Sequence, residues 1–141
     1  MISLDEFVER LCKVGADRGP RGFPRNAKDR SVLMQSIVMS LDSSRVYSER
    51  QINGALQAWN RDVAPAIEID HVTLRRLLVD QGRLERTPDG ASYRVGFPPA
   101  SVAFELQIYD LDLRATVAAY REYLKNRPRR APKPAPPARA R

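Results

Sequence analysis

The side chains best suited to bind another molecule fall on a short helix that the sequence predicts over residues 70–81. Arg75 and Arg76 lie opposite three leucines at the spacing of a buried stripe, with Thr73 along the flank of the exposed face. Arginine side chains reach both base edges and phosphate oxygens, so this face predicts a contact with nucleic acid. The three leucines are Leu74, Leu77 and Leu78.

The candidate contact surface extends to the segments before and after this helix. A predicted hairpin and the basic arm at residues 18–30, which consists of a loop up to Asn26 and the start of the next helix, would add contacts to phosphate. The candidate nucleic-acid site consists of Thr73, Arg75, Arg76, Arg83, Arg86, Arg94, Arg21, Arg25 and Lys28. Asp80 and Glu85 lie among these residues and would repel phosphate, which favours the alternative of an ordinary solvated surface.

The sequence predicts neither catalysis nor a bound metal. His71 is its one histidine and Cys12 its one cysteine, which argues against most catalytic triads and zinc sites. Cys12 falls on an apolar stripe and is expected to be buried and unreactive. We interpret Asp110 and Asp112 as the boundary of a turn before a helix rather than as an acid–base pair. We therefore expect no enzymatic activity, no catalytic residue, no cofactor and no small-molecule substrate.

The net charge of +7 lies mostly at the C-terminal end. Residues 127–141 hold six basic side chains, five prolines and no acidic residue, which predicts a disordered basic tail. The rest of the chain carries the remaining +1, so the overall charge is weak evidence that the folded part binds nucleic acid.

The composition predicts one globular domain located in the cytoplasm. A chain of 141 residues with 43% hydrophobic residues is sufficient for one domain with a core. No apolar run is long enough to cross a bilayer, and the acidic, amphipathic start MISLDEFVER does not resemble a signal peptide. We therefore expect no association with a membrane.

Apolar spacing and turn residues predict the order of the elements. Helices are expected to begin after the capping residues Ser3, Asn26, Ser48, Asp70 and Asp112. Pro88-Asp89-Gly90 is a turn sequence between strands at 84–86 and 92–95, and this hairpin is expected to pair with Val46-Tyr47. Alternating apolar residues favour a further strand at 102–108. Trp59 is expected in the core.

Three ordered strings in the chain resemble the DUF2087 family. They are FPRNAKDR, VYSERQING and DHVTLRRLLVDQGRLER, followed by YR, and together they span residues 23–94. The resemblance implies a winged-helix-like bacterial domain of undetermined function that is sometimes attached to transcriptional-regulator domains. It implies no catalytic residue. The loop at residues 59–68 is longer than the short link expected before the helix at 70–81.

The predicted fold class is α+β, mainly α: a winged helix-turn-helix with an added N-terminal helix and a C-terminal helix. Residues 1–17 would form the N-terminal helix, packed on the winged-helix domain at 18–96. Residues 97–126 would form a strand and helix extension, and 127–141 the basic tail.

Two functions follow from this prediction. The first is a small cytoplasmic, non-enzymatic protein that binds DNA and resembles a transcription regulator. The alternative is a module for protein–protein interaction or dimerisation on the same scaffold, with the terminal helices forming a homodimer.

Overall fold

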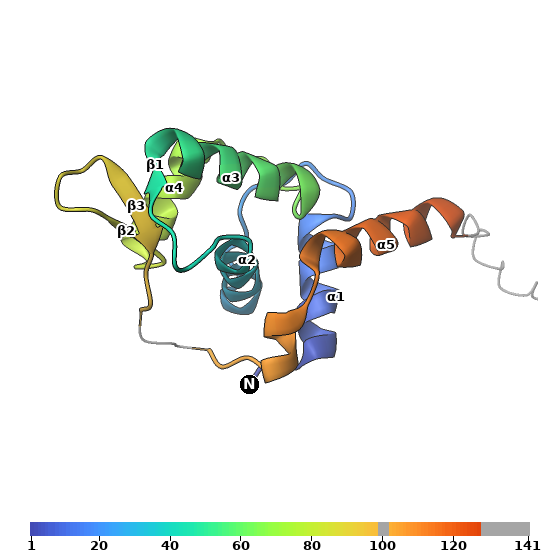
Figure 1. The fold of residues 1–141 in the computed structure, drawn as a ribbon. Helices are drawn as coiled ribbons and strands as arrows, with labels where there is room; N and C mark the ends of the chain where they lie inside the picture. The colour runs from blue at the N-terminus through green and yellow to red at the C-terminus, as the bar shows by residue number, and fades with distance from the viewer. Residues whose placement is uncertain (99–101, 128–141) are drawn as a thin grey trace, which may run out of the picture.

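The computed structural model describes residues 1–98 and 102–127 as a mainly helical chain with one small sheet (Figure 1). Its helices are α1 (Leu4–Gly15), α2 (Ala27–Met39), α3 (Glu49–Asp62), α4 (His71–Asp80), the 3₁₀ helix η1 (Leu106–Asp110) and α5 (Leu113–Asn126). Its strands are β1 (Tyr47–Ser48), β2 (Leu84–Arg86) and β3 (Ser92–Val95). None of these helices is long and apolar enough to span a bilayer. The predicted α+β, mainly α, class is confirmed.

Each α-helix is preceded by a side chain that accepts a hydrogen bond from the backbone N–H three residues later. These capping residues are Ser3, Asn26, Ser48, Asp70 and Asp112. At Ser48 the cap is reciprocal, because the Gln51 side chain accepts from the Ser48 N–H at 2.9 Å. Each cap satisfies a donor that the first turn of a helix leaves unpaired. The predicted helix starts are confirmed.

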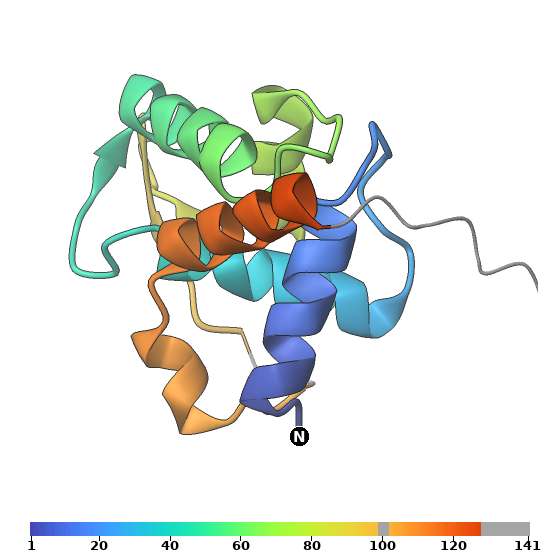
Figure 2. The same ribbon diagram turned by 90° about the vertical axis from the view of Figure 1, so that its right-hand side faces the viewer.

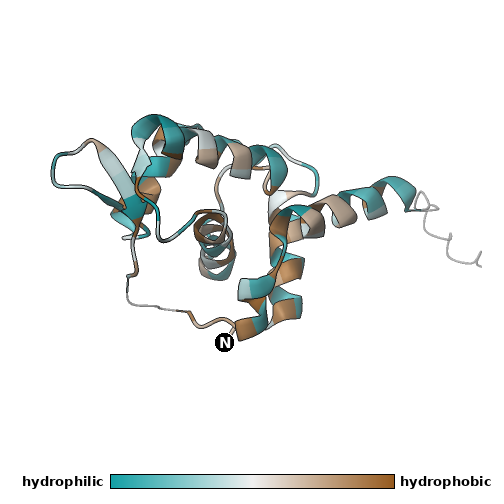
Figure 3. Ribbon diagram, viewed as in Figure 1, coloured by the Kyte–Doolittle hydropathy of each residue, from teal (hydrophilic) through white to brown (hydrophobic). Residues whose placement is uncertain are grey.

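Helix α2 runs through the middle of the molecule, with the other helices and the hairpin around it (Figures 1 and 2). Trp59 of α3 is 2% exposed, and its indole Nε1 donates to the Ser36 hydroxyl of α2 at 2.9 Å. That hydroxyl donates in turn to the Leu33 carbonyl oxygen at 2.7 Å, so the buried polar groups are satisfied. Hydrophobic residues line α2, whereas the C-terminal end of α5 is hydrophilic (Figure 3). The prediction that Trp59 lies in the core is confirmed.

The three strands form an antiparallel sheet in the order β1-β3-β2. Tyr93 of the central strand pairs with Tyr47 on one side and with Arg86 on the other. The turn between β2 and β3 contains Gly90 with a φ of 73°, a conformation that glycine adopts without a Cβ clash. The predicted hairpin and its pairing with the short first strand are confirmed.

The strand predicted at residues 102–108 is wrong. Phe104 makes one isolated bridge with Ile2, and the chain then turns into η1. Ile108 is fully buried whereas Leu106 is 82% exposed, so the alternating residues do not share one buried face. A strand needs the edge of another strand to pair with, and local alternation of apolar residues does not provide one.

The C-terminal helix follows as predicted. Helix α5 contacts α1 and α3, and the Tyr120 hydroxyl in the middle of α5 donates to Asp17 Oδ2 at 3.1 Å. In the view of Figure 1 the C-terminal half of α5 extends beyond the body of the molecule. Most of the tail predicted at residues 127–141 lies outside the described residues, which end at Arg127.

Candidate nucleic-acid interface

Helix α4 is fixed by its cap and by two buried leucines. Leu74 and Leu78 are at most 1% exposed. The Asp70 carboxylate accepts from the Thr73 backbone N–H and from the Thr73 hydroxyl, both at 2.8 Å, and these bonds hold the pKa of Asp70 below its ordinary value. Gly82, with a φ of 75°, follows the last turn. The predicted start and end of this helix are confirmed.

Arg75 points into the molecule, which corrects the expectation that it faces outward. Its side chain is 14% exposed. Its Nη1 donates to Asn53 Oδ1, its Nη2 lies 3.7 Å from a carboxylate oxygen of Glu49, and its guanidinium lies 5.5 Å from the centroid of the Tyr93 ring. The helical period placed Arg75 on the outer face, but α3 packs against that side and supplies an amide and a carboxylate. Arg75 therefore joins α4 to α3 and to the hairpin.

Thr73 and Arg76 are exposed on the outer face of α4. Arg76 has no hydrogen-bond or ion-pair partner for its side chain in the part of the chain that the structure describes. Asp80 is exposed one turn further along the same helix. The outer face of α4 thus carries one available guanidinium and one carboxylate, and the charge of the face is balanced.

The three hairpin arginines have different surroundings. Arg94 Nε donates to Glu85 Oε1 at 3.0 Å across the β2–β3 pair. Arg86 is exposed, and its Nε donates to the Gly90 carbonyl oxygen at 3.2 Å. Arg83 is half-buried and lines a cavity bordered by both ends of the hairpin. The hairpin therefore offers Arg86 to a partner of α4, rather than three arginines.

Two side chains of the basic arm at residues 18–30 have partners within the chain. Arg21 donates to the carbonyl oxygens of Lys13 at 3.0 Å and of Asp17 at 2.6 Å. Lys28 Nζ lies 3.4 Å from a carboxylate oxygen of Glu6. Backbone carbonyl oxygens thus occupy Arg21, and Glu6 of α1 pairs with Lys28 in the first turn of α2, which reduces what the basic arm offers to phosphate.

Other arginines outside α4 and the hairpin are also exposed. Arg25 is exposed, and so is Arg18, whose neighbour Pro20 lines a shallow depression together with Thr73. Arg50, the second residue of α3, is also exposed and was missed by the sequence reasoning. The signal that could have found it is its place in the first turn of α3, two residues after the capping Ser48.

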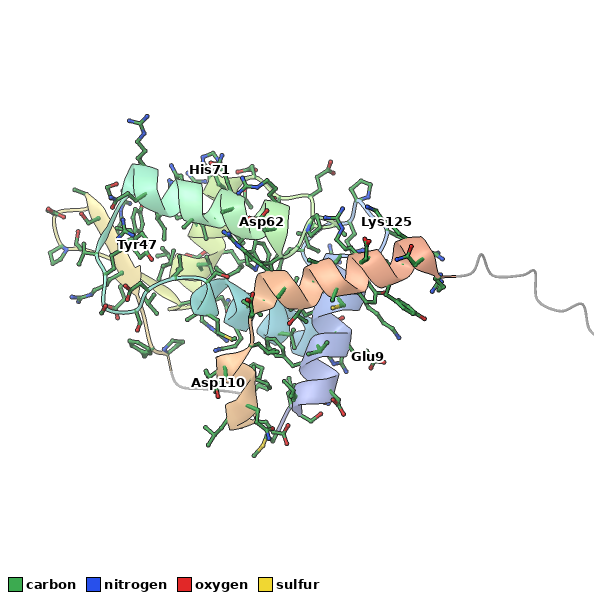
Figure 4. All side chains as sticks on the ribbon, turned by 45° about the vertical axis from the view of Figure 1, so that its right-hand side comes forward. Glu9, Tyr47, Asp62, His71, Asp110 and Lys125 are labelled. Carbon is green, nitrogen blue, oxygen red and sulfur yellow. The ribbon has the colours of Figure 1, made fainter. Side chains whose placement is uncertain are left out.

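The remaining reactive side chains are far apart or buried. His71 Nδ1 lies 3.2 Å from Gln57 Nε2 on the surface, on the opposite side of the molecule from Asp110 (Figure 4). Cys12 is 3% exposed, and burial raises the pKa of its thiol to about 11, so the reactive thiolate is scarce at neutral pH. Asp112 caps α5. Residues 1–98 and 102–127 contain no group of three side chains placed to bind a metal ion.

The comparison with protein families covers the elements from α2 to β3. Residues 21–95 match the family described as "Uncharacterized protein conserved in bacteria (DUF2087)". This span holds the sheet, α2, α3 and α4, and it leaves α1, η1 and α5 outside. No curated protein and no solved structure matches the chain. Because the match extends over more than half of the 141 residues, the chain belongs to the DUF2087 family.

Proposed function

We propose that this chain is a winged-helix protein of the transcription-regulator type, which binds double-stranded DNA through α4 and performs no chemistry on it. The observation that carries the proposal is the order helix, strand, helix, helix, strand, strand from α2 to β3, with the sheet order β1-β3-β2. In a helix-turn-helix protein the second helix of the pair enters the major groove, and here that helix is α4.

The outer face of α4 has side chains that suit this role. The major groove admits an α-helix, and an arginine there forms two hydrogen bonds with guanine. Arg76 and Thr73 are exposed and would face the bases. The Arg86 guanidinium lies 5.7 Å from the centroid of the Tyr93 ring, and Arg75 of α4 contacts the same ring. The Arg86 guanidinium is therefore close to α4 and would contact phosphate.

The balance of charges predicts weak binding by the folded part. Arg76, Arg86 and Arg50 would supply about three phosphate or base contacts, which corresponds to a slope of about −3 in a plot of log affinity against log salt concentration. Exposed carboxylates at Glu68 and Asp80, near the two ends of α4, limit the affinity further. The basic residues at 127–141 would add affinity without sequence preference.

The test is fluorescence anisotropy with a short labelled duplex of mixed sequence, over a range of salt concentrations. The double variant Arg76→Ala/Arg86→Ala should bind at least about tenfold more weakly, with a salt slope shallower by about 2. Arg121→Ala is the matched control, because Arg121 is exposed on α5, away from α4. A chain that ends at Asn126 separates the contribution of the tail. Binding that depends on the tail alone and is unchanged in the double variant would refute the proposal.

A second candidate function, self-association through the terminal helices, is favoured by the projecting half of α5 (Figure 1). Tyr123 on this half is 59% exposed, and its ring centroid lies 6.5 Å from that of Tyr120. Tyr120 also lines an apolar depression between α1 and α5 together with Val8 and Ala119. Sedimentation equilibrium tests this candidate: a dimer that dissociates in Tyr123→Glu supports it, and a monomer at high concentration excludes it.

A further inference from the structure

A cavity of about 380 Å³ lies between α2 and the segments that flank the hairpin. Its walls come from the C-terminal half of α2, the turn after it, the residue before β2, the segment after β3 and residues between positions 102 and 109. This volume falls within the range of about 300–1,000 Å³ that is common for small-molecule sites. The cavity shares no residue with Thr73, Arg76, Arg86 or Arg50, the side chains proposed to contact DNA.

Most of the cavity wall is apolar. Val38 and Met39 line it from α2, and Phe104 lines it from the C-terminal segment. Phe104 is held in place by an edge-to-face contact with Phe7, at a centroid separation of 5.8 Å. Phe97 also lines the cavity, and it is 78% exposed. Its aromatic ring therefore lies in water when no ligand covers it. The wall therefore fits a ligand with an apolar body.

Arg83 is the one charged side chain among the described residues that line the cavity. It is half-buried, and the described part of the chain offers its guanidinium neither a hydrogen-bond nor an ion-pair partner. Burial lowers the pKa of this guanidinium, which nevertheless stays protonated at neutral pH. Withdrawing an unpaired cation from water costs free energy, and an anion in the cavity would offset this cost.

We infer that this cavity binds a small carboxylic acid with an apolar body, and that Arg83 pairs with its carboxylate. A guanidinium presents two parallel N–H donors that match the two carboxylate oxygens. Tyr109 and Gln35 line the same cavity, and their side chains would supply further hydrogen bonds to the acid. A phosphate ester fits less well, because a doubly charged group surrounded by apolar walls would require more than one cation. The inference does not rest on DNA binding.

The experiment is isothermal titration calorimetry on the full chain, without DNA, with 4-phenylbutyrate and its neutral analogue 4-phenylbutyramide as probes. The acid should bind at least about tenfold more tightly than the amide, since a charge-assisted pair contributes about 1.5 kcal/mol or more. Arg83→Met keeps the apolar stem and removes the charge, so it should remove this preference and leave the amide unaffected. Arg121→Met, on α5, is the matched control.

A second variant tests the apolar wall. Phe97→Ala changes an exposed ring, so it should fold normally and weaken both probes severalfold. Thermal unfolding of Arg83→Met checks that any loss of binding is not a loss of structure. Equal affinity of the acid and the amide, full acid affinity in Arg83→Met, or no saturable binding of the acid to the parent chain would each overturn the inference. None of these results depends on whether the chain binds DNA.

Discussion

The two regions that meet at the turn between α4 and β2 each bury much of an arginine side chain, but the residues that the structure describes supply partners for this side chain in only one of them. Arg75 lies between α4, α3 and the sheet, where it contacts Asn53, Glu49 and Tyr93. Arg83 lies only a few residues further along the chain, in an apolar cavity, and the described residues provide no acceptor for its guanidinium.

This difference distinguishes Arg75, which stabilises the packing of α4, from Arg83, whose guanidinium is available to a ligand. A cation that leaves water is stabilised only if hydrogen bonds and an opposite charge replace the lost hydration. The partners of Arg75 lie on two other elements, so its guanidinium fixes how α4 sits against them. The desolvation of Arg83 has no such compensation within the described chain, and this is the physical reason for assigning its partner to a bound acid.

The largest expected effect comes from Gly96, which lies where the two regions join. Its N–H donates to the Arg83 carbonyl oxygen at 2.9 Å, and a Cβ at this position would collide with the Gly82 carbonyl oxygen. Gly96→Ala should therefore lower the free energy of unfolding by about 3 kcal/mol, measured by urea denaturation. Gly54→Ala is the matched control: its Cβ meets nothing within 4 Å, and it should stabilise α3 by about 0.5–1 kcal/mol.

The next largest effect should come from Arg75→Met. This substitution keeps an apolar stem but removes the hydrogen bond, the ion pair and the contact with the aromatic ring, so it should lower the free energy of unfolding by about 2 kcal/mol. Arg76→Met, one residue away on the exposed face, should stay within about 0.5 kcal/mol of the parent. Equal effects at the two positions would mean that the contacts of Arg75 contribute nothing to stability.

The same substitution at Arg83 should have a smaller effect of the opposite sign. Arg83→Met removes a half-buried charge that has no partner among residues 1–98 and 102–127, so the free energy of unfolding in the absence of ligand should be unchanged or higher by up to about 1 kcal/mol. Urea denaturation under the conditions used for Arg75→Met makes the comparison direct. A loss as large as that at Arg75 would contradict the view that the two arginines differ.

The elements of the fold could be predicted from the sequence because their signals act over short distances. Ser48 and Gln51 cap each other within one helical turn, and Gly82 and Gly90 end or turn the chain at their own positions. The strand predicted at residues 102–108 failed because a strand depends on a partner that lies elsewhere in the chain. Local periodicity reports the shape of a segment, and it does not report whether an edge is available to pair with it.

The candidate site could be predicted only in part, because the exposure of a side chain depends on other elements. Periodicity placed Arg75 and Arg76 together, and it was right for Arg76. Periodicity was wrong for Arg75, because it does not report the side-chain amide of Asn53, which lies 22 residues before Arg75 in the chain and binds its guanidinium. The cavity around Arg83 gave no signal in the sequence, since its lining comes from α2, both ends of the hairpin and the C-terminal segment.

The smallest expected effect concerns Asp70, whose carboxylate caps α4, the helix that carries Arg75. Hydrogen bonds from Thr73, first of all from its backbone N–H, lower the pKa of Asp70 in the folded chain. The unfolded chain therefore takes up the proton first as the pH falls, so the stability that the cap contributes is present above pH 3.8 and is lost below it.

Asn also caps helices well, so Asp70→Asn should resemble the parent at neutral pH and lose less stability in acid. Thermal unfolding followed by circular dichroism, from neutral pH to about pH 2.5, measures this difference, with Asp80→Asn on the same helix as the matched control. Parallel acid curves for Asp70→Asn and the parent would mean that the ionised cap does not help to hold α4, and that the position of this helix and of its Arg75 depends on packing alone.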